Sequence, residues 1–424
     1  MTQSKPAFFY GWYNVSTAFV GMALCYAMFT VFSFGTFVKP LEAEFGWQRG
    51  ELSFALTMTN IAVVIASPLL GFLIDRTGVR RVLIPSIILM SLTVASMALL
   101  DGNIWHFYLM YFLIPVLGAG TLPQSYSRVI ITWFSRRRGL ALGIALSGFG
   151  VGAAIIPAFA QFMIANFGWR SAYLGFALAI FAISLPMTIF LFREKPADLG
   201  LSADGDDDNP DLETAKDISS INLTGQAAAK TKNYWLILTS FLLVGIGLTS
   251  ILAHLVPMLI GRGVAPATAT LCMSSLGIGL IFGRIFAGYL MDRFFAPYVA
   301  AVFLLGLVLG IVILATGTSS SLVFVAAILV GLATGSEISE IAYICSRYFG
   351  QKSFGQIYGI MFAAFQLGSA FGAPLMGVYY DKAGNYIGAL WTVAIIVFIG
   401  TALITMLGPY PDAESSCQKR HSVT

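Results

Sequence analysis

Residues 71–81 read Gly-Phe-Leu-Ile-Asp-Arg-Thr-Gly-Val-Arg-Arg, and residues 288–293 return the beginning of this stretch as Gly-Tyr-Leu-Met-Asp-Arg, 217 positions later. A second match, Trp133-Phe134 with Tyr348-Phe349, lies at an offset of 215. These offsets are close to half of the 424 residues. One internal repeat of this length predicts two halves with the same fold.

The composition places these halves in a membrane. The chain has 24 Lys or Arg and 20 Asp or Glu, so that 10% of its residues are charged and 58% are hydrophobic. A soluble protein has about 25% charged residues, because charges cover its surface. Soluble enzymes, disordered chains and nucleic-acid binders are therefore excluded, and we expect the outer surface to contact a lipid bilayer.

Apolar segments of about 20 residues, the length that crosses a bilayer, recur along the chain. There are twelve: 11–38, 48–74, 82–100, 104–133, 139–165, 171–192, 233–260, 267–291, 297–317, 321–346, 354–380 and 386–408. We therefore predict an all-α polytopic membrane protein with 12 transmembrane helices in two pseudo-symmetric halves. Its parts are an N-terminal six-helix bundle at 1–192, a cytoplasmic linker at 193–232, and a C-terminal six-helix bundle at 233–424 with a short cytoplasmic tail.

The basic residues predict the orientation. With the N-terminus inside, 17 of the 24 Lys and Arg residues fall on the inner side, five on the outer side, and two, Arg128 and Arg284, within the spans. Positive charge favours the cytoplasmic side. Both termini are therefore expected in the cytoplasm and the chain in the plasma (inner) membrane, as a monomer.

Several motifs resemble one family of transporters. The stretch 71–81 resembles the signature loop of the major facilitator superfamily. Residues 133–145 resemble the fifth-helix motif of the monocarboxylate transporters and their oxalate/formate relatives, and Arg284 and the tract 335–350 resemble their eighth and tenth helices. The resemblance covers essentially the whole chain. It implies the major facilitator fold, with two halves that rock about a central site.

Arg284 is the first candidate for substrate binding. It lies eight residues before Asp292, or about 12 Å along a helix, which places it near the middle of the bilayer. Its guanidinium stays charged there and needs an anion, and a carboxylate can satisfy it with two hydrogen bonds. The resemblance implies that Arg284 receives the substrate carboxylate. The alternative is a permanent ion pair with a carboxylate of the tenth span.

Proton coupling has three candidates, Glu337, Glu340 and His254. The two glutamates share one face of the tenth span, and a buried carboxylate can take up a proton that a nearby anion stabilises. Glu337 is preferred. One glutamate could instead neutralise Arg128, and a single histidine on an apolar helix is more often a packing residue.

The gating candidates lie at the cytoplasmic ends of the spans. Asp75 is expected beside the backbone amides that open the third span and next to Arg80, as a latch that can close or break. Arg128 and Asp292 complete the set. The alternative is that the arginines of this loop only fix the topology.

Aromatic side chains are the candidates for the rest of the binding site. Tyr26, Tyr126 and Tyr343 could offer hydroxyls to a carboxylate, although packing explains such tyrosines equally well. Phe32 and Phe365 suggest an apolar wall. Oxalate transporters place a second cation where this chain has Phe365, and one fixed cation suits a monoanion.

The sequence therefore predicts a secondary active transporter of small organic monocarboxylates, lactate- or pyruvate-like or aromatic, in symport with a proton. No enzymatic activity, cofactor or metal site is expected. An exchanger of organic anions, of the oxalate/formate type, is the alternative. A receptor or an intramembrane enzyme is disfavoured, because the chain shows neither a sizeable soluble segment nor a nucleophile–base cluster.

Overall fold

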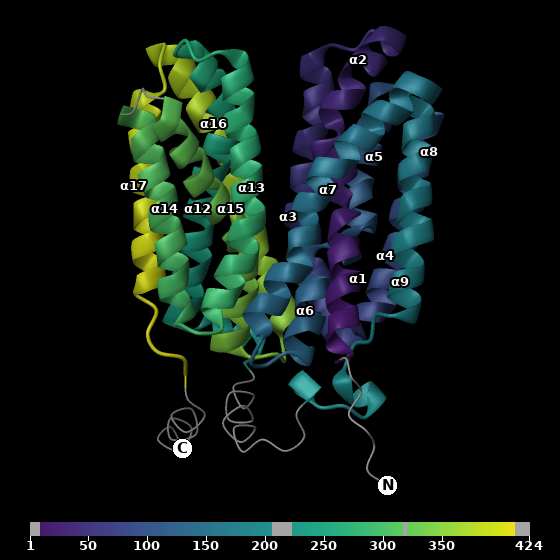
Figure 1. Ribbon diagram of the computed structural model, residues 1–424. Coiled ribbons are helices and arrows are strands. Elements are labelled where there is room, and N and C mark those ends of the chain that lie inside the picture. Colours follow the sequence, from purple (N-terminus) through teal and green to yellow (C-terminus); the bar gives the residue numbers. More distant parts are fainter. Residues whose placement is uncertain (1–8, 206–222, 317–319, 412–424) are drawn as a thin grey trace. The chain divides into compact units, whose positions relative to one another are not determined.

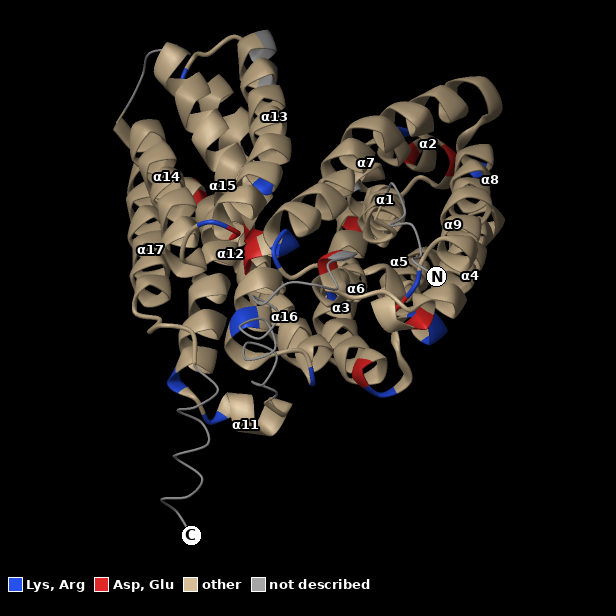
Figure 2. Cartoon of the chain, turned by 60° about the horizontal axis from the view of Figure 1, so that its bottom comes forward, with Lys and Arg blue, Asp and Glu red and all other residues tan. Residues whose placement is uncertain are grey.

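The computed structural model describes residues 9–205, 223–316 and 320–411. The chain divides into two compact units, Met1–Ser220 and Ile221–Thr424, called here the N-unit and the C-unit. Both are built from helices, and the described residues contain no strand (Figure 1). Charged residues gather at helix ends and loops, and most of the helix length is uncharged (Figure 2). The all-α prediction is confirmed.

The N-unit contains α-helices, 3-10 turns and two π-helical segments. They are α1 (Gly11–Ala23), η1 (Met28–Phe32, π), α2 (Phe34–Phe45), α3 (Arg49–Thr77), α4 (Val79–Ser96), η2 (Met97–Leu99), α5 (Ile104–Leu117), η3 (Ala119–Thr121), α6 (Pro123–Trp133), α7 (Arg138–Phe167), α8 (Trp169–Ala179), η4 (Ile180–Ser184, π), α9 (Leu185–Phe190), η5 (Pro196–Leu199) and η6 (Ala203–Gly205).

The C-unit is built from longer helices with fewer interruptions. They are α11 (Gly225–Ala229), α12 (Lys232–Gly261), α13 (Pro266–Met291), α14 (Ala296–Thr316), α15 (Ser320–Phe349), α16 (Phe354–Ala383) and α17 (Ile387–Thr405).

Eleven helices are long and apolar enough to cross a membrane, counted over the described residues. The predicted segment 104–133 is the exception. This segment is not one continuous helix, because α5 ends at Leu117 and α6 begins at Pro123. The fourth crossing of the N-unit is therefore a broken helix.

The break in the fourth crossing has a local cause. Proline has no backbone N–H to continue a helix and is favoured at its first turn, and Pro123 occupies that position in α6. The groups freed by the break find partners, since the Gly120 amide donates to Ser86 Oγ at 3.2 Å and Thr121 Oγ1 donates to the Gly118 carbonyl at 2.8 Å. The position equivalent to Pro123, 215 residues later, is Ile338, and α15 runs through it unbroken.

Each unit pairs its helices in the same way. The first crossing packs on the fifth (α1 on α7, α12 on α16), the second on the fourth (α3 on α5, α13 on α15), and the third on the sixth (α4 on α8, α14 on α17). The repeat seen in the sequence is therefore also a repeat of packing.

Glycines bring paired helices into backbone contact. A methyl group at Gly148 would lie 1.9 Å from the Phe19 carbonyl oxygen, and one at Gly368 would lie 1.9 Å from that of Leu242. In α15, a methyl group at Gly335 would lie 2.0 Å from the Leu280 carbonyl oxygen of α13. Small residues allow such approaches between membrane helices.

The repeat extends to the segment after the sixth crossing of each unit. Trp133 Nε1 donates to the Arg193 carbonyl at 2.9 Å, and its repeat mate Tyr348 donates its hydroxyl to the Gly408 carbonyl. Both the donors and the acceptors are separated by 215 positions. Two aromatic residues of different type therefore anchor equivalent segments. This shared contact supports the internal repeat beyond the similarity of the sequence.

We predict that Gly368→Ala lowers the melting temperature of the protein in detergent. The added methyl group would force α16 away from the backbone of α12, and overpacking of this kind costs about 1–3 kcal/mol. Gly377→Ala in the same helix is the control, because its methyl group would meet only His254 at 3.8 Å. Equal melting temperatures for the two variants would contradict the backbone contact.

Candidate functional site

Arg284 lies in α13, seven residues before its last residue, Met291, and only 1% of it is exposed. Its Nε donates to the Gly335 carbonyl of α15 at 2.8 Å. The close approach of α15 at Gly335 makes this contact possible, since any larger residue would collide with the α13 backbone. The contact fixes the orientation of a buried cation, which would be costly in the membrane without polar partners.

Glu337 and Glu340 follow Gly335 on α15 and are both buried, with 4% and 0% exposure. Glu337 interacts electrostatically with Arg284 and with Glu340. Its Oε2 has no hydrogen-bond partner among the described residues, and neither carboxylate oxygen of Glu340 has one there. The structure thus brings together Arg284, Glu337 and Glu340, three of the predicted site residues, within the C-unit.

The ion pair of the N-unit joins Asp75 of α3 to Arg128 of α6, with 2.7 Å between Oδ1 and Nη1. Arg80 instead donates from Nη2 to the Ile189 carbonyl at 2.8 Å. Arg128 therefore has a counterion from its own unit. The sequence had paired Asp75 with Arg80.

The amides that open α4 meet a different carboxylate from the predicted one. Glu194 Oε1 accepts from the Val79 amide at 3.1 Å, whereas Asp75 was expected there. Gly78, which precedes the helix, has φ 89°, and a methyl group on it would lie 2.9 Å from Glu194 Oε2. Ala296, the repeat mate of Val79, donates its amide to the Tyr410 hydroxyl at 3.0 Å.

Asp292 follows Met291 at the end of α13. Beside it, the Arg293 guanidinium lies 4.4 Å from the centre of the Tyr289 ring. The equivalent pair of α3 repeats this stack, with 3.9 Å between the Arg76 guanidinium and the Phe72 ring. Asp75 and Asp292, two of the four gating candidates, thus lie at equivalent ends of two equivalent helices.

His254 lies on α12 and joins it to α16 and α17. Its Nε2 is 2.9 Å from the Ala373 carbonyl oxygen and its Nδ1 is 3.3 Å from the Tyr386 hydroxyl. A carbonyl only accepts, so that Nε2 carries the hydrogen. Burial, with neighbouring Tyr380 and Asp381, raises the pKa of Tyr386, which keeps its hydroxyl protonated and able to donate to Nδ1. This geometry favours a packing role.

The predicted aromatic residues do not share one place. Tyr126 is fully buried inside the N-unit, where its ring is 5.9 Å from that of Phe192. Its hydroxyl lies so close to Gly21 of α1 that a methyl group there would be 2.2 Å away. These neighbours favour packing over substrate contact.

The other four aromatic residues of the predicted set differ in exposure. Tyr26 and Tyr343 are buried, with 7% and 6% of their surface exposed. Phe32 of η1 is 40% exposed, whereas Phe365 of α16 is buried, with 7% of its surface exposed. Phe365 lies in the C-unit, as do Tyr343 and the charged residues Arg284, Glu337 and Glu340.

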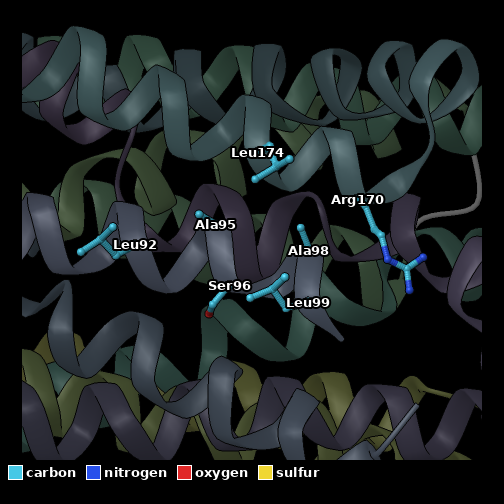
Figure 3. Close-up of a pocket in the computed structure, with 7 residues that line it drawn as sticks. All are labelled: Leu92, Ala95, Ser96, Ala98, Leu99, Arg170 and Leu174. Carbon is cyan, nitrogen blue, oxygen red and sulfur yellow. The ribbon is translucent and has the colours of Figure 1, made fainter. Parts of the chain in front are cut away.

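A hollow of about 520 Å³ lies on the surface of the N-unit (Figure 3). Its lining is Leu92, Ala95, Ser96, Ala98, Leu99, Arg170 and Leu174. The arginine is engaged, because Arg170 Nη1 lies 2.6 Å from Glu44 Oε1. Hydrogen bonds from Trp169 and Arg170 hold the pKa of Glu44 below its usual range, so this ion pair persists at neutral pH. The hollow therefore lacks an available anion-binding group.

The sequence missed two contacts of the site region, the Gly335 carbonyl and Glu194. A glycine in a short Gly-Ser-Glu run gives no sign that its carbonyl will receive an arginine. A periodicity of Gly279, Gly283, Gly331 and Gly335 could have indicated the close helix pair. Among the described residues, no group of three His, Cys, Asp or Glu side chains could hold a metal ion.

Comparison with known proteins identifies the family. The sequence profile of the Major Facilitator Superfamily matches residues 18–335 and 257–422. The chain belongs to the Major Facilitator Superfamily. It is a multi-pass membrane transporter and not an enzyme.

Relatives of this transporter have low identity but long alignments. Monocarboxylate transporter 11 of Mus musculus is 24% identical over 401 residues, which cover 92% of this chain and 86% of that protein. The MFS-type transporter YcxA of Bacillus subtilis is 24% identical over 405 residues, covering 92% and 93%. Monocarboxylate transporter 13 of Rattus norvegicus is 25% identical over 404 residues, covering 94% and 89%.

Solved structures share the fold of this transporter. The proton:xylose symporter XylE, bound to 6-bromo-6-deoxy-D-glucose, has a TM-score of 0.75 at 15% identity and covers 95% of this chain and 97% of its own. The transporter FucP in its outward conformation has a TM-score of 0.69 at 16% identity, covering 92% and 97%. The predicted major facilitator fold is confirmed.

We predict that the Asp75–Arg128 pair is coupled energetically. Asp75→Asn and Arg128→Gln should each lower the melting temperature, because each leaves one charge poorly compensated. The double variant should lose less than the two losses together, by about 0.5–3 kcal/mol. Arg76→Gln, next in sequence and exposed, is the control. Additive losses would contradict the coupling.

Proposed function

We propose that this transporter carries small organic monocarboxylates together with a proton. The observation that supports this most is Arg284, a buried cation held by the Gly335 carbonyl beside Glu337. The names of the relatives, monocarboxylate transporters 11 and 13, favour the same substrate class.

The carboxylate is the chemical partner that Arg284 suits best. A guanidinium offers parallel N–H donors that match the two oxygens of a carboxylate. Arg128, the other arginine predicted within a span, is paired with Asp75. Arg284 is therefore the preferred site for the substrate carboxylate. Phe365 would supply an apolar wall for the substrate tail, and the Tyr343 hydroxyl would add a polar contact.

Charge balance links the proton to the substrate. An anion that binds Arg284 competes with Glu337 for the same cation, and a second negative charge in the bilayer costs several kilocalories per mole. A proton on Glu337 removes that charge. Anion and proton then cross together by alternating access, and no net charge is buried during the crossing.

The gating proposal follows the ion pair of the N-unit. Asp75 and Arg128 would separate and rejoin during the cycle, with Arg80 and Asp292 at the same predicted cytoplasmic ends of the helices. The excess of basic residues on that side supports cytoplasmic termini and an inner-membrane location.

We predict that Arg284→Gln abolishes uptake into proteoliposomes. Radiolabelled L-lactate, pyruvate and benzoate are the probes, chosen after a thermal-shift screen of carboxylates. Uptake should fall about 100-fold, because a paired, charged contact is worth roughly 3 kcal/mol. Arg293→Gln, at the exposed end of the same helix, should retain uptake.

Two results would contradict the proposal. A folded Arg284→Gln variant that still transports would place the carboxylate elsewhere. Wild-type uptake that ignores a collapsed pH gradient, and appears only in liposomes preloaded with another carboxylate, would indicate anion exchange.

A further inference from the structure

The buried charges of the C-unit have no counterparts in the N-unit. Arg284 corresponds to Ser67 at an offset of 217, and Glu337 and Glu340 correspond to Leu122 and Ser125 at an offset of 215. Ser67 instead exchanges hydrogen bonds with Gln124, at 3.0 and 2.8 Å. The equivalent helices therefore pack with neutral residues at these positions, so the fold itself does not require the three charges.

Glu340 is the most isolated of these charges. It is 0% exposed, and neither of its carboxylate oxygens has a hydrogen-bond partner among the described residues. Ser336, one turn earlier, donates its hydroxyl to the Ala333 carbonyl at 3.0 Å and also lies within interaction range of the Glu340 carboxylate. Glu337 is the charged group within electrostatic reach of Glu340.

The other titratable groups on the helices that pack against α15 lie mostly near the helix ends. They are Cys272 and Tyr289 of α13, with Asp292 directly after it, Tyr298 of α14, Tyr358, Tyr379, Tyr380, Asp381 and Lys382 of α16, and Lys232, Tyr234 and His254 of α12. Neither carboxylate oxygen of the buried Glu340 has a geometric hydrogen bond among the described residues to offset its burial. An ionised carboxylate without a partner in such a place costs several kilocalories per mole. A proton on Glu340 would avoid this cost, while Glu337 lies within electrostatic reach of Arg284.

We infer that Glu340 is the proton relay of this transporter, which hands its proton to Glu337 when a substrate carboxylate occupies Arg284. The inference rests on the proposed function. Residues three apart share one helix face, and Glu340 is the one nearer to Arg347 and the predicted cytoplasmic end, by about 4.5 Å of helix rise. Glu340 thus lies between Glu337 and that end.

The transfer conserves charge at every step. The O–H bond of Glu340 breaks as an O–H bond forms on Glu337, directly or through one water molecule. Glu340, left ionised and unpaired, then takes a proton from water at the predicted cytoplasmic end. One anion and one proton have then been loaded from the predicted cytoplasmic side; after reorientation the anion and the Glu337 proton leave on the opposite side, and uptake runs the same sequence in reverse. Glu340 is a relay and does not touch the substrate.

The test compares Glu340→Gln with wild type in proteoliposomes, with radiolabelled L-lactate, pyruvate and benzoate as probes. Gln preserves the neutral shape of protonated Glu340 but cannot pass a proton on. Uptake driven by a pH gradient should fall at least about tenfold, the scale of a lost proton-transfer group. Counterflow between loaded liposomes, which needs no net proton movement, should stay within about twofold. Ser125→Ala, at the repeat position, should change neither rate.

Each outcome decides the inference. Gradient-driven uptake that Glu340→Gln leaves unchanged assigns Glu340 to packing and overturns the relay, although the proposed function stands. If Glu340→Gln does not fold, Glu340→Asp replaces it: selective slowing of gradient-driven uptake supports the relay, and equal loss of both rates overturns it. A wild type that is indifferent to the pH gradient overturns the proposed function and the relay with it.

Discussion

The hydrogen bond from Arg284 Nε to the Gly335 carbonyl is the contact on which the site depends. An arginine in the bilayer keeps its charge and must be surrounded by polar groups. Only a helix that approaches to backbone distance can offer its carbonyl there, and Gly335 permits that approach. The Arg284–Gly335 pair therefore serves both the packing of α13 on α15 and the placement of the buried cation. Glu337, two residues further along α15, interacts electrostatically with the same guanidinium.

The two units share one architecture but differ in their polar residues. Their helices pair in the same order, and an aromatic residue anchors the segment after the sixth crossing in both. Yet the N-unit places Ser67 where the C-unit has Arg284. It also caps the third crossing with a carboxylate, Glu194, where the C-unit uses the Tyr410 hydroxyl. Shared packing preserves the fold, and the differences carry the proposed chemistry.

The sequence predicted the helices, the repeat and the buried charges because each depends on composition or spacing along the chain. It could not predict contacts between distant segments. Asp75 was expected at the amides of the third span, but Glu194, more than 100 residues later, accepts there. Tyr126 was a binding candidate until its neighbours Gly21 and Phe192 were known. The break before Pro123 escaped notice because an apolar run looks continuous whether or not its helix is.

In the proposed cycle, a buried cation, a substrate anion and one proton make an electrically neutral cargo complex. Measurement of charge movement tests it directly, with proteoliposomes that transport benzoate under a fixed pH gradient while the membrane potential is varied with potassium and valinomycin. If the complex is neutral, uptake follows the pH gradient and does not change with the membrane potential. Uptake driven by the membrane potential alone would contradict it.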